Sequence, residues 1–276
     1  LFNSPRAFHR LRLFNSVRLL NSLRLFNSLR LLNSLSLRHI AAIYHRTLRM
    51  NSNHPVLNLI AEITSALSSR QGPLIVEQTL SCLVEMDLTT ESMLQLEPSM
   101  PGIFVDDLDV AVKHIPPQLN ALARAIDASK HLIQWKRDLG QFYEKGADVG
   151  DSYRNRNMNC ILIGSKNGFF HSDKLIMGLF FLQPYTFYRD HDHEASEMYF
   201  NLTGPHGFRF DVSGWSDYSA DSIVWNTPWL PHATRVYDVP LLTVFAWVEN
   251  VDCLCRVVHA GDWVQLENEL VTASAG

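Results

Sequence analysis

The chain has 276 residues, of which 46% are hydrophobic and 19% are charged, and its formal net charge is −4. This composition is typical of a globular protein with one substantial domain and an accessory segment, and the lack of an apolar run of ~18 residues argues against a membrane protein. Residues 1–61 hold nine arginines and no lysine or acidic residue, so the other 215 residues, with 15 basic and 28 acidic side chains, carry −13. An acidic folded part is a poor match for nucleic acid, and no nucleic-acid partner is expected.

Residues 1–50 form a low-complexity, arginine-rich extension. Between Leu13 and Ser34 a six-residue unit repeats, with two apolar residues, Asn-Ser, one apolar residue and Arg. Six residues advance a helix by about 600°, so successive repeats turn their apolar pairs to different faces. We expect this extension to be disordered or not native, with Met50 as the true start. An organellar transit peptide is the alternative, because such leaders are rich in arginine and serine and poor in acids.

Residues 51–150 are predicted to be mainly helical. Apolar residues recur at helical spacing over Pro55–Arg70, and Pro73 is suited to start a second helix. A third helix is predicted over Pro117–Trp135, whereas Thr89–Val112 has mixed character. We expect this region to pack on the β domain that follows or to form the face of a homodimer.

Residues 151–265 are predicted to form a β domain, followed by a C-terminal tail at 266–276. Short runs of aromatic and β-branched residues alternate with glycine and proline, as in sandwiches and barrels of short strands. The predicted strands include Leu175–Leu182, Met198–Leu202, Phe208–Val212, Ser222–Trp225, Ala233–Tyr237, Leu241–Val248 and Leu254–Val258.

Cysteine usage favours a cytoplasmic location. The four cysteines form no Cys-x-x-Cys pair, and Cys253 and Cys255, two residues apart on a predicted strand, are badly placed for a disulfide. Reduced, mostly buried thiols are typical of intracellular proteins. The organellar alternative depends on residues 1–50 alone.

A histidine-rich segment carries the strongest functional signal. Alternate residues of a strand face the same side, so His191 and His193 can direct their imidazoles at one ion. Glu197 is also an odd-numbered residue, and a short turn after His193 would bring it to the same ion from a neighbouring strand. His232 would come from a later strand. Three histidines and a glutamate leave open positions on a divalent transition metal, and zinc, iron, manganese, cobalt and nickel all suit them. The structural alternative is a solvated histidine-rich loop without metal.

The spacing His191-x-His193-x3-Glu197-x6-Gly204 resembles the first sequence motif of the cupin β-barrels. The second cupin motif is degraded around His232, where prolines stand without the usual glycine and asparagine. The resemblance implies a mainly β protein with a cupin barrel, also called a double-stranded β-helix or jelly roll, preceded here by a helical segment.

The segment from Met177 to Trp247 resembles the cupin-type dimethylsulfoniopropionate (DMSP) lyases. The shared features are Tyr188 ahead of the His-x-His pair, Tyr199 two residues after the acidic ligand, Pro231-His232-Ala233, and a Pro-Leu-Leu strand that ends in tryptophan. Arg189 and Glu194 depart from prolines that are usual in the family. The resemblance implies a carbon–sulfur lyase that converts DMSP, a small sulfonium carboxylate, into dimethyl sulfide and acrylate by β-elimination.

The resemblance also assigns roles to residues. It implies Tyr199 as the general base and Tyr188 as a residue that orients the substrate carboxylate or shares the proton, with the four metal ligands His191, His193, Glu197 and His232. For Tyr199 the alternative is a core aromatic residue that hydrogen-bonds a metal ligand. A sulfonium cation offers no hydrogen-bond donor and is held by aromatic faces, so Trp225, Trp247 and Phe210 are candidate substrate contacts.

Two other functions remain open from the sequence. One is a different metal-dependent cupin enzyme, such as an iron oxygenase acting on a related small carboxylate, which would not require a tyrosine two residues after the glutamate. The other is a non-catalytic cupin that binds a small ligand as a sensor. A regulator of that kind usually carries a basic helix-turn-helix, and the sequence contains no such segment.

Overall fold

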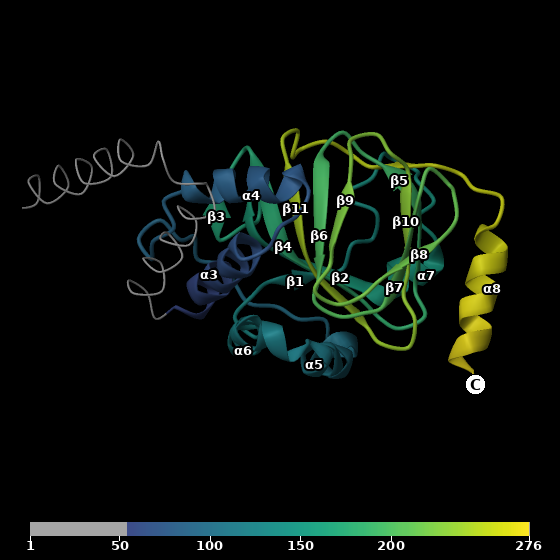
Figure 1. The fold of residues 1–276 in the computed structure, drawn as a ribbon, viewed down its shortest axis with the longest axis horizontal. Coiled ribbons are helices and arrows are strands. Elements are labelled where there is room, and N and C mark those ends of the chain that lie inside the picture. The colour runs from purple at the N-terminus through teal and green to yellow at the C-terminus, as the bar shows by residue number, and fades with distance from the viewer. Residues whose placement is uncertain (1–53, 276) are drawn as a thin grey trace, which may run out of the picture.

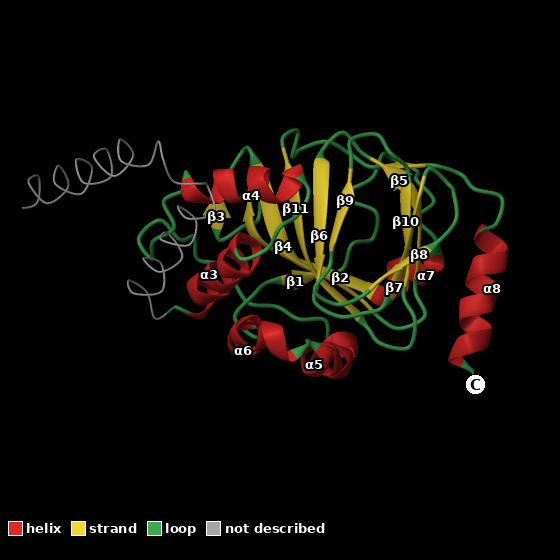
Figure 2. Ribbon diagram, viewed as in Figure 1, coloured by secondary structure: helices red, strands yellow, loops and turns green. Residues whose placement is uncertain are grey.

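Two β-sheets that face each other form the centre of the protein, with helices packed against the outer face of the larger sheet (Figure 1). This computed structural model describes residues 54–275. The predicted extension at residues 1–50 lies outside the described residues. Figure 2 shows the strands between a helical layer on one side and the C-terminal helix on the other.

Strand pairing in both sheets is almost entirely antiparallel. The larger sheet has the order β1-β2-β4-β11-β6-β9, with β3 added in parallel beside β2. Its strands are β1 Trp135–Lys136, β2 Asn157–Gly164, β3 Phe170–His171, β4 Leu175–Leu182, β6 Ser196–Asn201, β9 Ile223–Asn226 and β11 Leu241–Val248. The smaller sheet has the order β12-β5-β10-β7-β8, built from β5 Phe187–Asp192, β7 His206–Phe210, β8 Ser216–Tyr218, β10 His232–Arg235 and β12 Arg256–Val257.

The central strands β4 and β11 were predicted with both ends correct. They are apolar along almost their whole length because one face meets the helices and the other meets the second sheet. Gly178 allows β4 to approach β2 closely, since a Cβ at this position would lie 1.8 Å from the carbonyl oxygen of Cys160.

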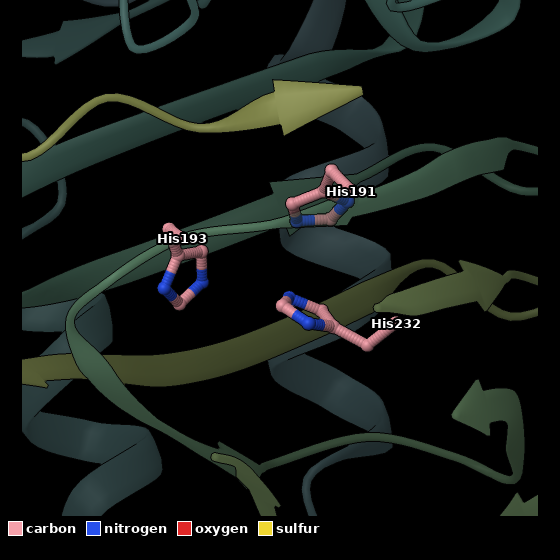
Figure 3. A group of neighbouring side chains, drawn as sticks. All are labelled: His191, His193 and His232. Atoms are coloured by element: carbon pink, nitrogen blue, oxygen red, sulfur yellow. The ribbon is translucent and has the colours of Figure 1, made fainter. Parts of the chain in front are cut away.

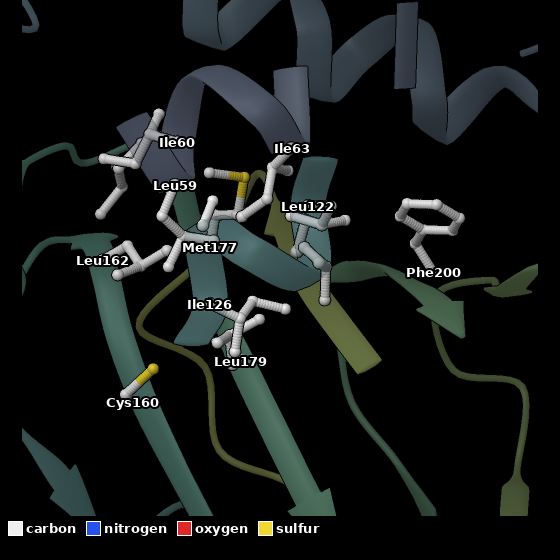
Figure 4. Close-up of a cluster of buried hydrophobic side chains, with 14 of the residues drawn as sticks. Leu59, Ile60, Ile63, Leu122, Ile126, Cys160, Leu162, Met177, Leu179 and Phe200 are labelled. Atoms are coloured by element: carbon white, nitrogen blue, oxygen red, sulfur yellow. The ribbon is translucent and has the colours of Figure 1, made fainter. Parts of the chain in front are cut away.

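The helical layer closes one core of the molecule. It contains α3 Pro55–Ser68, α4 Leu74–Val84, α5 Val105–His114 and α6 Asn120–Ser129, with short 3-10 turns at Gly102–Phe104 and Pro117–Leu119. Figure 4 shows Leu59 and Ile63 of α3 and Ile126 of α6 against Met177 and Leu179 of β4, and all five side chains are fully buried. Removal of this apolar surface from water is the main stabilising contribution of the layer.

Two helical predictions differ from the structure. The third predicted helix ends at Ser129 and does not reach Trp135, because Trp135 pairs with Cys160 as strand β1. The region predicted as mixed contains α5, whose acidic first turn and basic last turn match the helix dipole. Strand pairing thus ended the third helix early, whereas α5 is a short helix that buries only Leu108 and Ala111.

The predicted C-terminal tail at 266–276 falls largely within helix α8, Trp263–Ser274. The buried side chains Trp263, Leu266 and Leu270 pack against Phe187 and Ala233 of the smaller sheet. Helix α8 therefore backs the strand that leads into the histidine-rich segment. A short helix, α7 Asp151–Arg156, lies just before β2.

The prediction of a mainly β domain preceded by a helical region is confirmed. The strands of residues 54–275 pair within two separate sheets, so they form a cupin-like sandwich without one closed barrel of hydrogen bonds. None of the helices in this range is long and apolar enough to cross a membrane.

Candidate active site

Three histidines meet at one end of the space between the sheets. His191 on β5 and His232 on β10 are directly opposite partners of adjacent strands, and His193 follows two residues after His191. One ring nitrogen from each histidine lies within 4.8 Å of the others, and all three side chains are buried. Figure 3 shows the three rings turned toward one another.

Each histidine is oriented by a backbone carbonyl. The Nδ1 atoms of His191, His193 and His232 lie 2.8, 2.9 and 2.9 Å from the carbonyl oxygens of Arg189, Ala195 and Leu230. A carbonyl can only accept, so Nδ1 carries the hydrogen, and the Nε2 lone pair of a neutral ring is left free. This is the tautomer in which histidine binds a metal through Nε2.

Glu197 reaches the histidines from the opposite sheet, on β6. Its Oε2 atom lies 3.3 Å from Nε2 of His193 and 3.4 Å from Nε2 of His232. The cross-strand partners of Glu197 fix its carboxylate: Trp247 Nε1 donates to Oε1 at 2.6 Å, and Asn226 Nδ2 donates to Oε2 at 2.6 Å. The loop between β5 and β6 thus carries the motif from one sheet to the other.

This set of side chains fits a divalent metal ion. The lone pairs of the histidines and of Glu197 face one another at short range and repel each other. This arrangement is stable only when a proton or a metal ion lies between them. His232 Nε2 is buried and has no hydrogen-bond partner.

The protonation states of the site agree with metal binding. Burial is the main cause that holds the pKa of His191 well below its ordinary value, and the neighbouring histidines add to it, so the ring is neutral. Burial raises the pKa of Glu197, but His193 and His232 outweigh it, and the net pKa is well below the ordinary value.

A cavity of about 50 Å³ opens beside Glu197. Most of its wall is aromatic or aliphatic, and the lining residues are Asp138, Phe142, Tyr153, Asn159, Ile176, Phe180, Tyr188, Glu197, Tyr199, Phe245, Trp247 and Cys255. Such a mostly apolar space with a few polar groups is typical of a small-molecule site.

Both predicted catalytic tyrosines line this cavity. Tyr199 is two residues after Glu197 on β6, and burial, followed by the charge of Glu197, raises its pKa well above the ordinary value. Tyr188 stacks on Tyr153 with ring centroids 4.1 Å apart, and its hydroxyl accepts a hydrogen bond from Tyr143 at 2.6 Å. Burial also raises the pKa of Tyr188.

The three predicted substrate aromatics have different positions. Trp247 lies in the cavity wall, where its ring is 4.5 Å from the ring of His193. Trp225 pairs with Met198, faces the helical layer and donates to Ser196 Oγ, because alternate residues of β9 face opposite sides. Phe210 packs in the core between the sheets but is not part of the cavity wall. Of these three, only Trp247 contacts the cavity, so the assignment of Trp225 and Phe210 to the substrate is not supported.

The part of the cavity wall that comes from residues before β4 was not predicted from the sequence. Asp138, Phe142, Tyr153 and Asn159 lie far along the chain from the histidine motif, and no periodic pattern marks them. A possible signal is the Asp138-x-Gly140 turn, in which Oδ1 of Asp138 accepts from the backbone of Gly140 at 2.8 Å. Asn226 is a lone amide at the end of an apolar strand, and this position is a similar signal for a residue that hydrogen-bonds the Glu197 carboxylate.

Comparison with known proteins gives the family. The sequence profile of the DMSP lyases matches residues 101–243, just over half of the chain and including the whole histidine motif. The chain belongs to the DMSP lyase family. DMSP lyase DddQ of Ruegeria pomeroyi is 28% identical over 127 residues, which are 46% of this chain and 60% of that relative, so the alignment spans less than two thirds of it.

Two solved structures share the fold of this family member. A chain from the crystal structures of the DMSP lyases RdDddP and RnDddQII superposes with a TM-score of 0.55 at 18% identity, covering 74% of this chain and 98% of that one. DMSP lyase DddQ from Ruegeria pomeroyi DSS-3 superposes with a TM-score of 0.55 at 22% identity, covering 75% of this chain and 98% of that one. At these identities the likeness establishes the fold.

Proposed function

We propose that this protein is a metal-dependent lyase that cleaves DMSP into dimethyl sulfide and acrylate. The observation that carries the proposal is the convergence of three carbonyl-oriented histidines beside Glu197, which lines the cavity together with Tyr199. Membership of the DMSP lyase family supports the same reaction, since the curated relative DddQ is a DMSP lyase.

His191, His193, Glu197 and His232 would hold the ion. A divalent cation at this position supplies positive charge that neutralises the substrate carboxylate and stabilises the charge that develops beside it. Trp247 and Asn226 keep the Glu197 carboxylate turned toward the histidines. The substrate carboxylate therefore belongs at this end of the cavity.

Tyr199 is the proposed base. In the elimination, the phenolate oxygen of Tyr199 takes the proton from the carbon next to the carboxylate and becomes the phenol, the carbon–carbon double bond forms, and the carbon–sulfur bond breaks with its electron pair leaving on sulfur. The protein around Tyr199 favours the protonated phenol, because burial and Glu197 raise its pKa. Tyr199 must therefore lose its own proton first, and a positive charge nearby would favour the phenolate by lowering this pKa. Tyr188 lines the same wall, and its proposed role is to orient the carboxylate or share the proton.

Release of dimethyl sulfide tests the activity directly. The purified chain, supplied in turn with Zn²⁺, Fe²⁺, Mn²⁺, Co²⁺ and Ni²⁺, is incubated with DMSP, and headspace dimethyl sulfide and dissolved acrylate are measured together. We expect equal amounts of the two products with at least one metal. Release of neither product with any of the five metals would overturn the proposal.

His232→Ala tests the ligand set. His232 is buried and its Nε2 atom has no hydrogen-bond partner, which leaves its lone pair for a metal ion, so we expect metal affinity to fall by more than about 100-fold and activity to fall with it. Metal content after dialysis against a weak chelator is the measurement. A variant that keeps its metal would remove His232 from the site.

A further inference from the structure

Asp138 places a buried carboxylate in the wall of the cavity. The side chain is 1% exposed and comes from the loop after β1, far along the chain from the histidine motif. Its Oδ1 atom accepts from the backbone N–H groups of Gly140 at 2.8 Å and Gln141 at 3.0 Å, and Oδ2 accepts from the Tyr153 hydroxyl at 2.7 Å. A backbone N–H can only donate, so these contacts match the ionised carboxylate.

The negative charge of Asp138 has no cationic partner among residues 54–275. This range contains three buried aspartates, and the other two each pair with an arginine, Asp190 with Arg209 and Asp192 with Arg256. Asp138 instead faces a cavity whose wall is otherwise mainly aromatic and aliphatic. A buried carboxylate without a counter-charge is costly, and a cation held in the cavity would relieve that cost.

The surrounding rings suit a cation that cannot donate hydrogen bonds. Tyr153 donates its hydroxyl hydrogen to Asp138 and stacks on Tyr188, and both tyrosines line the cavity. Donation to an anion makes the phenol ring more electron-rich, which strengthens its attraction for a cation over its face. Phe142 and Phe180 add further faces to the same wall.

We propose that Asp138 is the counter-charge for the cationic end of the substrate, so that the cavity selects a sulfonium or quaternary ammonium acid over an uncharged acid of the same shape. The inference rests on the proposed function, in which the carboxylate end of the same molecule is held beside Glu197. It gives Asp138 a role in specificity that is separate from the elimination itself.

A pair of isosteric acids tests this role by binding alone. 3-(Trimethylammonio)propanoate and 4,4-dimethylpentanoate have the same shape and the same carboxylate, and differ in the charge at the other end. Their dissociation constants are measured by calorimetry on the full chain, and any contribution from the metal cancels in the ratio. We expect the wild type to prefer the cationic acid by at least tenfold, and Asp138→Asn to lose most of this preference while its affinity for the neutral acid is unchanged.

Two further variants separate charge from structure. Glu144→Gln removes an exposed charge from the same loop and keeps the preference. Tyr153→Phe removes the phenol hydroxyl but leaves Asp138 its two backbone hydrogen bonds, and it should also keep a preference for the cation, which preserves the test if Asp138→Asn does not fold.

The inference is overturned if the wild type binds both acids equally or binds neither. It is also overturned if Asp138→Asn weakens both acids to the same extent, or if Tyr153→Phe abolishes the preference. Because turnover is not measured, a protein that released no dimethyl sulfide would fail the proposed function and would still report on Asp138.

Discussion

At the scale of single residues, the position of Glu197 is set by its two cross-strand neighbours. Trp247 and Asn226 lie on either side of Glu197 in the sheet, and each donates to one carboxylate oxygen at 2.6 Å. Strand register alone brings these donors to the carboxylate. The same two residues therefore determine how Glu197 meets His193 and His232.

Asn226→Ala is expected to weaken metal binding about 10–100-fold, the usual effect of removing a hydrogen bond to a metal ligand. The measurement is the metal dissociation constant by competition with a chelator. Trp225→Phe is the matched control, because the neighbouring residue faces the helical layer. Equal affinity in Asn226→Ala and wild type would show that Trp247 positions Glu197 without help.

Part of the candidate site could be predicted from single residues. The two-residue period of a strand predicted that His191 and His193 would point the same way, and the structure places both rings in one group with His232. Asp138 and Asn226 could not be predicted in this way, because their contacts arise from pairing between distant segments. Trp225 was predicted as a substrate contact because a tryptophan ring can hold a cation. On β9, however, alternate residues face opposite sides, and Trp225 faces the helical layer.

At the scale of elements, α8 supports the strand that carries His191. Arg209 on β7 forms ion pairs with Asp190 on β5 and with Asp262 at the start of α8, and Trp263 Nε1 donates to Asp190 at 2.8 Å. Asp190 and Arg209 are almost fully buried. This network links the smaller sheet to α8 at the residue next to the first histidine.

Asp190→Ala is expected to lower the free energy of unfolding by about 3–5 kcal/mol, because the buried Arg209 guanidinium keeps only the partly exposed Asp262 as a partner and the Trp263 N–H loses its acceptor. Urea unfolding of the metal-free protein is the measurement. Asp252→Asn breaks an exposed pair with Lys166 and should cost no more than about 1 kcal/mol. Similar losses in the two variants would mean that the buried pair is not a major source of stability.

Strands were predicted best where both faces of the strand are buried, because the sequence is then an almost continuous run of apolar residues. Strands β4 and β11 are apolar along almost their whole length, and both ends of each were predicted correctly. Strand β1 and helix α5 were not predicted. Trp135 continues a helical pattern but pairs with Cys160 in a strand, and α5 is a short helix in which only Leu108 and Ala111 are buried. Short elements of this kind depend on the contacts that the rest of the fold provides.

At the scale of the whole molecule, stability should depend on acid pH through His206. This side chain is fully buried at the start of β7, and burial lowers its pKa from 6.5 to about 3. Between these two pH values the unfolded chain binds a proton at this residue and the folded protein does not. The contribution is complete above pH 6.5 and is lost as the pH falls toward 3.

We expect His206→Gln to reduce the slope of unfolding free energy against pH by about 1.4 kcal/mol per pH unit between about pH 5.5 and 4. Urea unfolding at several pH values gives the slope, and the metal-site histidines contribute equally to both proteins. His171→Gln, at an exposed position, is the control and should leave the slope unchanged. An unchanged slope in His206→Gln would mean that the folded protein binds the proton as readily as the unfolded chain.

The most direct test of the account is the activity of Tyr199→Phe compared with its metal content. Tyr199 lines the cavity beside Glu197, so removal of its oxygen should lower dimethyl sulfide release at least about 100-fold. Bound metal should stay at the wild-type level, and Tyr237→Phe, which changes a hydroxyl that hydrogen-bonds Asp217, should keep full activity. Activity that persists in Tyr199→Phe, or is lost only together with the metal, would contradict the assignment of Tyr199 as the base.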